Sequence, residues 1–231
     1  MGKRQETRER IEAQIIELGR RHLVTEGAAG LSLRAIAREL GMVSSAVYRY
    51  VASRDELLTL LLVDAYTDLA DAVEDAQRTA GEPWRDQVRA IAHAVRSWAV
   101  AEPAGWALLY GSPVPGYRAP ADRTVGPGTR VVAAVFSAVA VGVAEGTVAT
   151  ATTAVPQPLP RDFAALREEF GFSGDDPVVA RCTTLWAALV GAVSLEVFGQ
   201  YGPDTLTDPR ALFDLQITLL TDFVAGGPGR Q

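Results

Sequence analysis

The sequence predicts an all-α protein with two parts: an N-terminal domain of three helices over residues 1–55 and a larger helical domain over residues 56–231. Two observations carry this prediction. Apolar residues recur at intervals of three and four along most of the chain, which is the spacing of one face of an α-helix. These stretches begin at Ser, Asp or Pro residues, and the clearest of them ends at a Gly, as helix starts and ends favour.

The first expected helix spans residues 4–26. Ile11, Ile15 and Leu18 lie along one of its faces, at i, i+4 and i+7. This apolar stripe is expected to pack against the next two helices and so to form a small three-helix core.

Two short amphipathic segments joined at Gly41 follow the first helix. Ser32 can accept a hydrogen bond from a free backbone N–H at the start of the first segment. Gly41 suits the left-handed conformation that ends many helices. Residues 44–50 are expected to form the second short helix. Ser53 and Glu56 then have the capping-box spacing that starts a longer helix.

Two short helices that meet at a Gly-containing turn form a helix-turn-helix, whose second helix fits the major groove of DNA. The alternative is an ordinary helical hairpin inside a core. The second segment carries side chains with hydrogen-bonding tips, namely Ser44, Ser45, Tyr48 and Arg49. No carboxylate lies within residues 40–54. A core helix would not carry so many polar groups, so the pattern favours a helix that reads DNA.

Charge is unevenly distributed along the chain. Residues 1–54 hold ten Lys and Arg against six Glu, a net charge of +4, and the remaining residues hold 12 basic and 22 acidic side chains, a net charge of −10. A basic head on an acidic body suits a polyanion, because only the head is attracted to it. A chance fluctuation of a few charges is the alternative. Within residues 1–10, the segment Arg4–Arg10 is expected to form either an arm that reaches along the DNA backbone or into a minor groove, or a solvated, disordered tail.

The helix-turn-helix segment and the start of the helix after it resemble the N-terminal domain of the tetracycline-repressor (TetR) family of transcriptional regulators. The shared features are Leu31-Ser32-Leu33-Arg34, Ile36-Ala37, Leu40-Gly41, Ala46-Val47-Tyr48 and Ser53-Arg54-Asp55-Glu56-Leu57-Leu58. Val43 departs from the family pattern, in which Ser or Thr commonly holds that capping position. The cap is therefore expected to move to Ser44.

The resemblance implies a ligand-responsive repressor that binds a pseudo-palindromic operator. It implies DNA contacts from Ser32, Arg34, Ser44, Ser45, Tyr48, Arg49, Tyr50 and Arg54. Tyr48 and Ser44 are expected to bond phosphates or base edges, and Ser45 to permit close approach. Arg34 and Arg54 are expected to hold flanking phosphates. Ser32 adds a hydroxyl or backbone N–H contact. For Tyr50 the alternative is that its ring closes the small core.

Further helices are expected beyond this segment. They run from Ser53 to Arg78, from Pro83 to Glu102, from Pro103 over a short stretch, over Val131–Ala144, over 163–170, from Asp176 onward and over 209–224. Residues 111–129 and 147–160 are rich in Gly or Pro and are expected to be weakly structured. A loop as long as the first is usually functional or mobile.

The last two helices are apolar on more than one face, which suits one face for the core and one for a partner. In TetR-like proteins these helices pair with their symmetry mates, so the resemblance implies a homodimer. Such a dimer places two reading helices one DNA turn apart, ~34–36 Å. Trp186, Gly191 and Leu195-Glu196 also resemble a C-terminal subtype marked by a Trp, a His-Gly pair and a Leu-Glu. Val190 stands in place of that His.

An apolar or amphipathic effector is expected to bind in the second part and to shift the helix that starts at Ser53, which releases the DNA. Such pockets are mostly apolar with a few polar groups. The candidates to line one are Trp98, Trp106, Tyr110, Tyr117, Phe136, Phe163, Thr183 and Trp186. For each aromatic residue, plain core packing is the alternative.

Composition limits the cofactor and the compartment. Cys182 is the only cysteine, which excludes an internal disulfide and suits a reducing cytoplasm. With His22 and His93 it gives no zinc pattern, so no metal or cofactor is expected. No run approaches the ~20 apolar residues that span a bilayer. No apolar segment follows the basic N-terminus, so neither a membrane span nor a signal peptide is expected.

Two other classes of function remain as alternatives. One is a small-molecule enzyme that uses His93, Glu168-Glu169 or Asp175-Asp176, although nucleophile-elbow, phosphate-loop and metalloprotease motifs are missing. The other is a dimeric helical interaction module without DNA binding.

Overall fold

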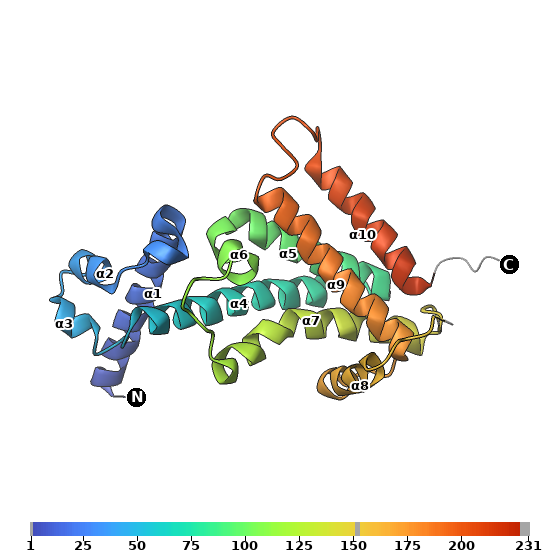
Figure 1. The fold of residues 1–231 in the computed structure, drawn as a ribbon, viewed down its shortest axis with the longest axis horizontal. Coiled ribbons are helices and arrows are strands. Elements are labelled where there is room, and N and C mark those ends of the chain that lie inside the picture. The colour runs from blue at the N-terminus through green and yellow to red at the C-terminus, as the bar shows by residue number, and fades with distance from the viewer. Residues whose placement is uncertain (1, 151–152, 227–231) are drawn as a thin grey trace. The chain divides into compact units, whose positions relative to one another are not determined.

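The chain is built from helices, as the sequence predicts: within residues 2–150 and 153–226, which the computed structural model describes, no strand forms. The helices are α1 (Lys3–Gly30), α2 (Leu33–Glu39), α3 (Ser44–Val47), α4 (Arg54–Thr79), α5 (Trp84–Ala101), α6 (Pro103–Tyr110), α7 (Ala121–Ala144), α8 (Leu159–Phe170), α9 (Asp176–Val197) and α10 (Pro209–Ala225) (Figure 1).

Contacts group the chain into two compact units. The first contains Met1–Asp68 and Glu102–Gly128, and the second contains Leu69–Ala101 and Thr129–Gln231. The helices α4 and α7 each run through the boundary between the units. The predicted boundary at residue 55 separates a DNA-binding part from a part that binds ligand and dimerises, whereas the two units are defined by contacts. That functional boundary stays a prediction.

The first unit packs around the core that the sequence predicts. Ile15 of α1, Ile36 of α2, Val47 of α3 and Leu57 of α4 are all fully buried in one apolar cluster. Two later segments, α6 and the loop after it, also pack against this cluster. They contribute the partly buried residues Ala104, Leu108, Val114 and Tyr117. The helices α1 to α3 are thereby held against the start of α4.

The first helix begins at Lys3, so residues 3–10 are helical and do not form a disordered tail, while their contact with DNA stays a prediction; residue 1 lies outside the described residues. Its regular part ends at Gly27, where φ is 67° and ψ is 174°. Glycine adopts this conformation without a steric penalty, so the expected end near residue 26 holds and a kinked turn follows.

The caps of the helix-turn-helix follow the sequence pattern. The Ala35 N–H donates to Ser32 Oγ at 3.4 Å, and the Glu56 N–H donates to Ser53 Oγ at 3.0 Å. Gly41 adopts φ 65°, and the next N–H, that of Met42, donates to the Ala37 carbonyl at 2.9 Å. The signals at Ser32, Gly41 and Ser53 are therefore confirmed by these hydrogen bonds.

The helix α3 is shorter than the expected helix over residues 44–50. The Arg49 and Tyr50 N–H groups donate to carbonyls three residues back, those of Ala46 and Val47, which tightens the last turn. The expected cap at Ser44 is wrong. Val43 occupies the capping position with no side-chain hydrogen bond, and Ser44 is the first helical residue.

The expectation of a loop over residues 111–129 is confirmed for residues 111–120 and wrong for residues 121–129, because α7 begins at Ala121. The Arg123 and Thr124 N–H groups donate to the Pro120 carbonyl, and Arg123 Nη1 binds both carboxylate oxygens of Glu56 at 2.8 and 2.9 Å. These contacts hold the first turns in helical form despite Pro127 inside the helix. The propensity of Gly and Pro is overridden by tertiary contacts.

The other predicted boundaries shift by a few residues. The helix α8 begins at Leu159, earlier than the expected residue 163, and no helix forms over residues 147–150 and 153–158. Residues 151–152 of that expected weak segment lie outside the described residues. The helices α9 and α10 begin at Pro-containing turns, with the side chains of Asp175 and Asp208 as caps.

The second unit is organised by α9, which packs against α5, α8 and α10 (Figure 1). Arg96 of α5 forms a bidentate ion pair with Glu196 of α9, and its guanidinium lies 5.5 Å from the centre of the Phe213 ring of α10. One arginine therefore ties three helices together.

Two helices, α7 and α9, are long and apolar enough to cross a bilayer by length and composition, with mean hydropathies of 1.6 and 1.7 over their most apolar windows. The sequence expectation concerned unbroken apolar runs, and the longest uncharged runs in these two helices, residues 131–144 and 182–195, stay shorter than ~20 residues. Core helices of soluble proteins pass the same test. Val135 and Phe136 of α7 and Leu185 and Leu189 of α9 are buried by their surroundings. In each helix, 39% of the most apolar window is buried inside the structure.

Candidate nucleic-acid interface

The recognition segment of the first unit is open to solvent. In Figure 1, α2 and α3 lie at the edge of their unit. Val47 is fully buried and anchors α3 to the core, while Ser45, Tyr48 and Arg49 are exposed. An anchored helix with an exposed polar side is the arrangement that a groove-reading helix requires.

Two exposed arginines beside this segment have no partner. Arg34 at the start of α2 and Arg49 after α3 make no hydrogen bond or ion pair within residues 2–150 and 153–226. Arg20 differs, because Asp64 and Asp68 of α4 each accept from it at 2.6 Å and raise the pKa of its guanidinium, chiefly through the hydrogen bond with Asp64. Arg34 and Arg49 thus remain available to an external anion.

The four other predicted DNA contacts are partly buried. Ser32 serves as the cap of α2, and Ser44 lies half-buried in the first turn of α3. Tyr50 packs against the apolar cluster, which agrees with the alternative of core closure. Arg54 donates from Nη2 to the carbonyls of Ala28 and Ala29 at 2.8 and 3.1 Å. Its role in phosphate binding stays a prediction, as do the other contacts.

A polar clamp that sequence reasoning missed holds α2 against α1. His22 Nε2 lies 2.6 Å from Glu39 Oε1, and Arg21 Nη2 donates to Glu39 Oε2 at 3.1 Å. The hydrogen bond with His22, with the nearby positive charges, lowers the pKa of the Glu39 carboxyl. The partners lie 17 and 18 residues apart in the sequence, so no local pattern signals the pair.

The predicted effector-lining residues are distributed over both units. Trp106, Tyr110 and Tyr117 belong to the first unit, where Trp106 and Tyr110 stack with ring centres 4.4 Å apart. Tyr117 shares a 2.9 Å hydrogen bond with Thr59. The other five belong to the second unit: Trp98, Phe136, Phe163, Thr183 and Trp186.

Several of these side chains are packed as core. Trp106, Phe136 and Phe163 are buried, and the Phe136 ring contacts Phe170 and Phe172 at 4.9 and 5.1 Å between ring centres. The Thr183 hydroxyl donates to the carbonyl one turn back. Trp98 and Trp186 are half-buried. A pocket built by these residues stays a prediction.

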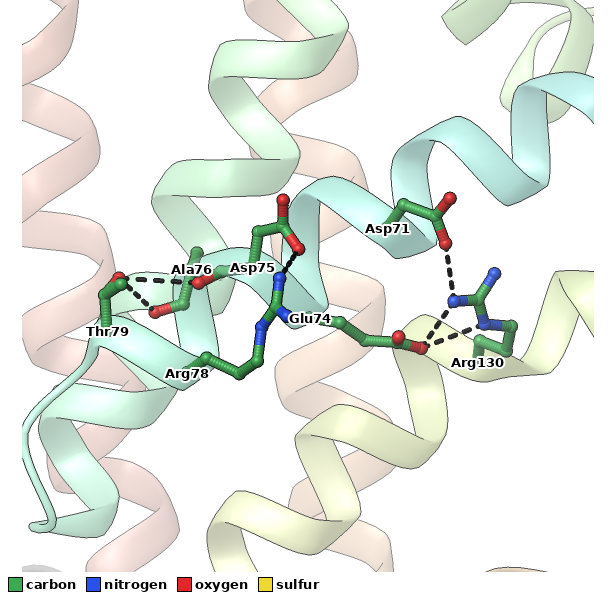
Figure 2. Close-up of polar contacts among 7 residues, drawn as sticks. All are labelled: Asp71, Glu74, Asp75, Ala76, Arg78, Thr79 and Arg130. Carbon is green, nitrogen blue, oxygen red and sulfur yellow. Dashed lines mark hydrogen bonds and ion pairs between the residues drawn. The ribbon is translucent and has the colours of Figure 1, made fainter.

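The second unit contains a polar link between α4 and α7 (Figure 2). Arg130 of α7 donates from Nη2 to Asp71 at 2.7 Å and to Glu74 at 2.6 Å, and from Nε to Glu74 at 2.9 Å. These hydrogen bonds, first that of Asp71, raise the pKa of Arg130. Asp71 and Glu74 lie one turn apart on the same face of α4. Arg130 therefore links that face of α4 to α7 through both carboxylates.

Possible metal ligands and the Cys182 thiol are the groups to consider for chemistry other than binding. Within the described part of the chain, no three His, Cys, Asp or Glu side chains gather in a way that could hold a metal ion. Burial raises the pKa of the Cys182 thiol to about 12, so it stays protonated at neutral pH and is a poor nucleophile.

A buried three-helix core that presents an exposed polar helix and two unpaired arginines defines a helix-turn-helix protein of the DNA-binding class. Comparison with known families agrees with this class. The family model described as "Bacterial regulatory proteins, tetR family" matches residues 15–61, and the model described as "Tetracyclin repressor-like, C-terminal domain" matches residues 88–220. The chain belongs to the TetR family of transcriptional regulators.

Relatives are similar over nearly the whole length. The HTH-type transcriptional regulators Rv1816 of Mycobacterium tuberculosis and Mb1846 of Mycobacterium bovis are each 64% identical over 226 residues, which cover 97% of this chain and 97% of each relative. The solved structure of SCO4313 has a TM-score of 0.77 at 30% identity and covers 95% of this chain and 98% of that one.

More distant structures share the fold. The TetR family transcriptional regulator PfmR from Thermus thermophilus has a TM-score of 0.57 at 14% identity, covering 94% of this chain and all of that one. Membership of the TetR family, shown by the family models and the 64% identical relatives, makes the chain a helix-turn-helix transcriptional regulator with DNA as its partner.

Proposed function

We propose that the chain is a cytoplasmic repressor that binds a pseudo-palindromic operator as a homodimer and is released by a small apolar or amphipathic effector. In this proposal residues 1–55 read the DNA, and residues 56–231 dimerise and bind the effector. The observation that carries it is the exposed recognition segment, in which Ser45, Tyr48 and Arg49 face solvent beside the unpaired Arg34.

The DNA contacts divide into two kinds. Arg34 and Arg49 bind phosphates, because they are exposed cations without internal partners. Ser45 and Tyr48 lie against base edges in the major groove, where a hydroxyl either donates or accepts. Ser32, Ser44, Tyr50 and Arg54 support these contacts from partly buried positions, and their first role is to hold the segment in place.

The dimer surface is assigned to α9 and α10. Leu215, Leu219 and Phe223 are exposed large apolar side chains at i, i+4 and i+8 of α10. The opposite face of α10 buries Phe213 and Ile217 against its own unit. A helix with one apolar face in the core and another in solvent suits a partner helix. Leu195 and Phe198 extend this surface at the end of α9.

The release mechanism runs through α4, a single helix of 26 residues that starts next to the recognition segment. Two arginines of α7 hold α4: Arg123 binds Glu56, and Arg130 binds Asp71 and Glu74. An effector that moves α7 therefore moves α4 as well. The distant fold relative FadR from Bacillus subtilis was solved in complex with stearoyl-CoA, which is an amphipathic molecule. Full release requires a ~10⁴-fold preference of the effector for the released state.

The test has two stages. Duplexes are first selected from a random pool with the wild-type chain, and the consensus is read for two-fold symmetry. The variants Arg34→Ala and Tyr48→Ala are then expected to bind the selected duplex measurably more weakly while sedimentation still reports a dimer. The matched control Arg89→Ala removes an equal charge from α5 and keeps binding. A dimeric chain that selects no DNA would refute the proposal and favour the interaction module.

A further inference from the structure

The position before α3 carries an apolar side chain that its surroundings do not explain. Val43 is 72% exposed, the highest value among the large apolar side chains of the described chain. It stands at the capping position of α3 with an extended backbone, φ −67° and ψ 140°; its carbonyl accepts from the Ala46 N–H at 2.8 Å, but its side chain makes no capping hydrogen bond. Its side chain therefore contributes little to the core and nothing to the cap.

Exposure of one valine is ordinary by itself, and Val24 of α1 is 71% exposed. The difference lies in position. Val43 directly precedes the recognition helix, two residues before the exposed Ser45. The N-terminal residues of a recognition helix are those that contact base edges. If α3 enters the major groove, Val43 is carried to the groove floor with it.

The floor of the major groove offers one apolar group that a valine fits. Among the four bases only thymine presents a methyl group there, at C5, while the other edges present hydrogen-bond donors and acceptors. A valine against those polar edges would remove water from them without replacing its hydrogen bonds, which is unfavourable. A valine against a methyl group buries apolar surface on both sides.

We propose that Val43 is a specificity-determining residue that recognises the C5-methyl group of one thymine in each half of the operator. This proposal rests on the proposed function, because it requires α3 to lie in the major groove. Loss of the methyl group removes about one buried apolar carbon, which is expected to weaken binding about fourfold per half-site and about 15-fold for both.

A role in stability alone predicts a different result. Val43→Ser supplies the hydroxyl that N-capping favours, so it is expected to keep or raise the stability of the head. If Val43 contacts DNA, the same variant loses the discrimination between thymine and a base without the methyl group. Stability and discrimination therefore move in opposite directions, and a folding defect cannot imitate the predicted outcome.

The experiment replaces each thymine of the selected duplex, in symmetric pairs, by deoxyuridine, which keeps the pairing with adenine and lacks only the methyl group. Equilibrium affinities are measured at one salt concentration for the full-length wild type, Val43→Ala, Val43→Ser and the control Val24→Ala. The wild type and Val24→Ala are expected to show the ~15-fold penalty at one symmetric position. In Val43→Ser that penalty is expected to vanish and in Val43→Ala to shrink, because the shorter alanine keeps only part of the apolar contact, while penalties at other positions remain.

Two outcomes would overturn the proposal while leaving the proposed function intact. The wild type binds its selected duplex but tolerates deoxyuridine at every position, or the penalty persists unchanged in both Val43 variants. A selected consensus that contains no thymine in its half-sites would also overturn the proposal for Val43. Failure to bind any duplex instead removes the proposed function itself, so the two failures are distinguished.

Discussion

The unpaired arginines beside the recognition segment should set the salt dependence of DNA binding. Arg34 and Arg49 are exposed and have no internal partner in the described chain, so both are free to displace counterions from phosphates. The perturbation is Arg34→Ala or Arg49→Ala. Neither side chain makes a hydrogen bond or ion pair in the described part of the chain and both are exposed, so each variant is expected to fold as the wild type does.

The magnitude follows from the number of phosphates that each arginine neutralises. The logarithm of the affinity falls with the logarithm of the salt concentration with a slope of about −0.9 for each phosphate contact. A dimer carries two copies of each arginine, so either substitution is expected to reduce the slope by ~1.8. Between 50 and 200 mM salt, the variant should then lose about 12-fold less affinity than the wild type.

The assay is a titration of the selected duplex at four or five salt concentrations, read by fluorescence anisotropy. Arg89→Ala is the matched control. It removes the same charge from α5, where Arg89 pairs with Asp86, and its slope should equal that of the wild type. If Arg34→Ala and Arg49→Ala both bind more weakly but keep the wild-type slope, neither arginine neutralises a phosphate. That result would refute the assignment of these two arginines to phosphate contacts.

Three further predictions concern stability. Ser53→Ala removes the cap on the Glu56 N–H and should cost about 1 kcal/mol in chemical denaturation; a loss below the error of the fit would contradict the cap. Arg181→Met should cost about 2 kcal/mol, because buried Arg181 donates to two backbone carbonyls that would lose their donor; equal or greater stability would show that its unpaired buried Nε dominates. Burial lowers the pKa of His93 despite the nearby Asp214. The unfolded chain therefore binds the proton more readily, so stability should fall as the pH drops below 6.5, and His93→Gln should flatten this decline.

The two ends of α2 and the start of α4 were the most predictable part of the fold. Ser32, Gly41 and Ser53 act through hydrogen bonds or backbone conformations within five residues of themselves, so the local sequence contains all the information. The core stripe of α1 was equally accessible, because its period is a property of the helix alone.

The features that were missed depend on residues far apart in the sequence. The first turns of α7 are helical because Arg123 reaches Glu56, 67 residues away, and this contact offsets the local preference of Gly and Pro for loops. The Glu39 clamp and the Arg130 link to α4 arise in the same way. The sequence shows that charged side chains are present, but it does not show which of them form ion pairs in the fold.

The candidate interface was predictable in its location and less so in its detail. The exposed Ser45, Tyr48 and Arg49 follow from the pattern of α3, whose one apolar anchor is Val47. The engagement of Arg54 with two carbonyls does not, because those carbonyls become available only where Gly27 breaks α1. The aromatic candidates for the effector pocket were chosen by residue type, which does not separate core packing from ligand contact.

The central claim is that α3 enters the major groove of one duplex twice, once from each protomer. Methylation interference on the selected duplex tests it most directly, because dimethyl sulfate modifies guanine N7 in the major groove and adenine N3 in the minor groove. The account predicts interference at guanines in two clusters about 10 base pairs apart, one helical turn. Interference confined to adenines, or to a single cluster, would contradict it.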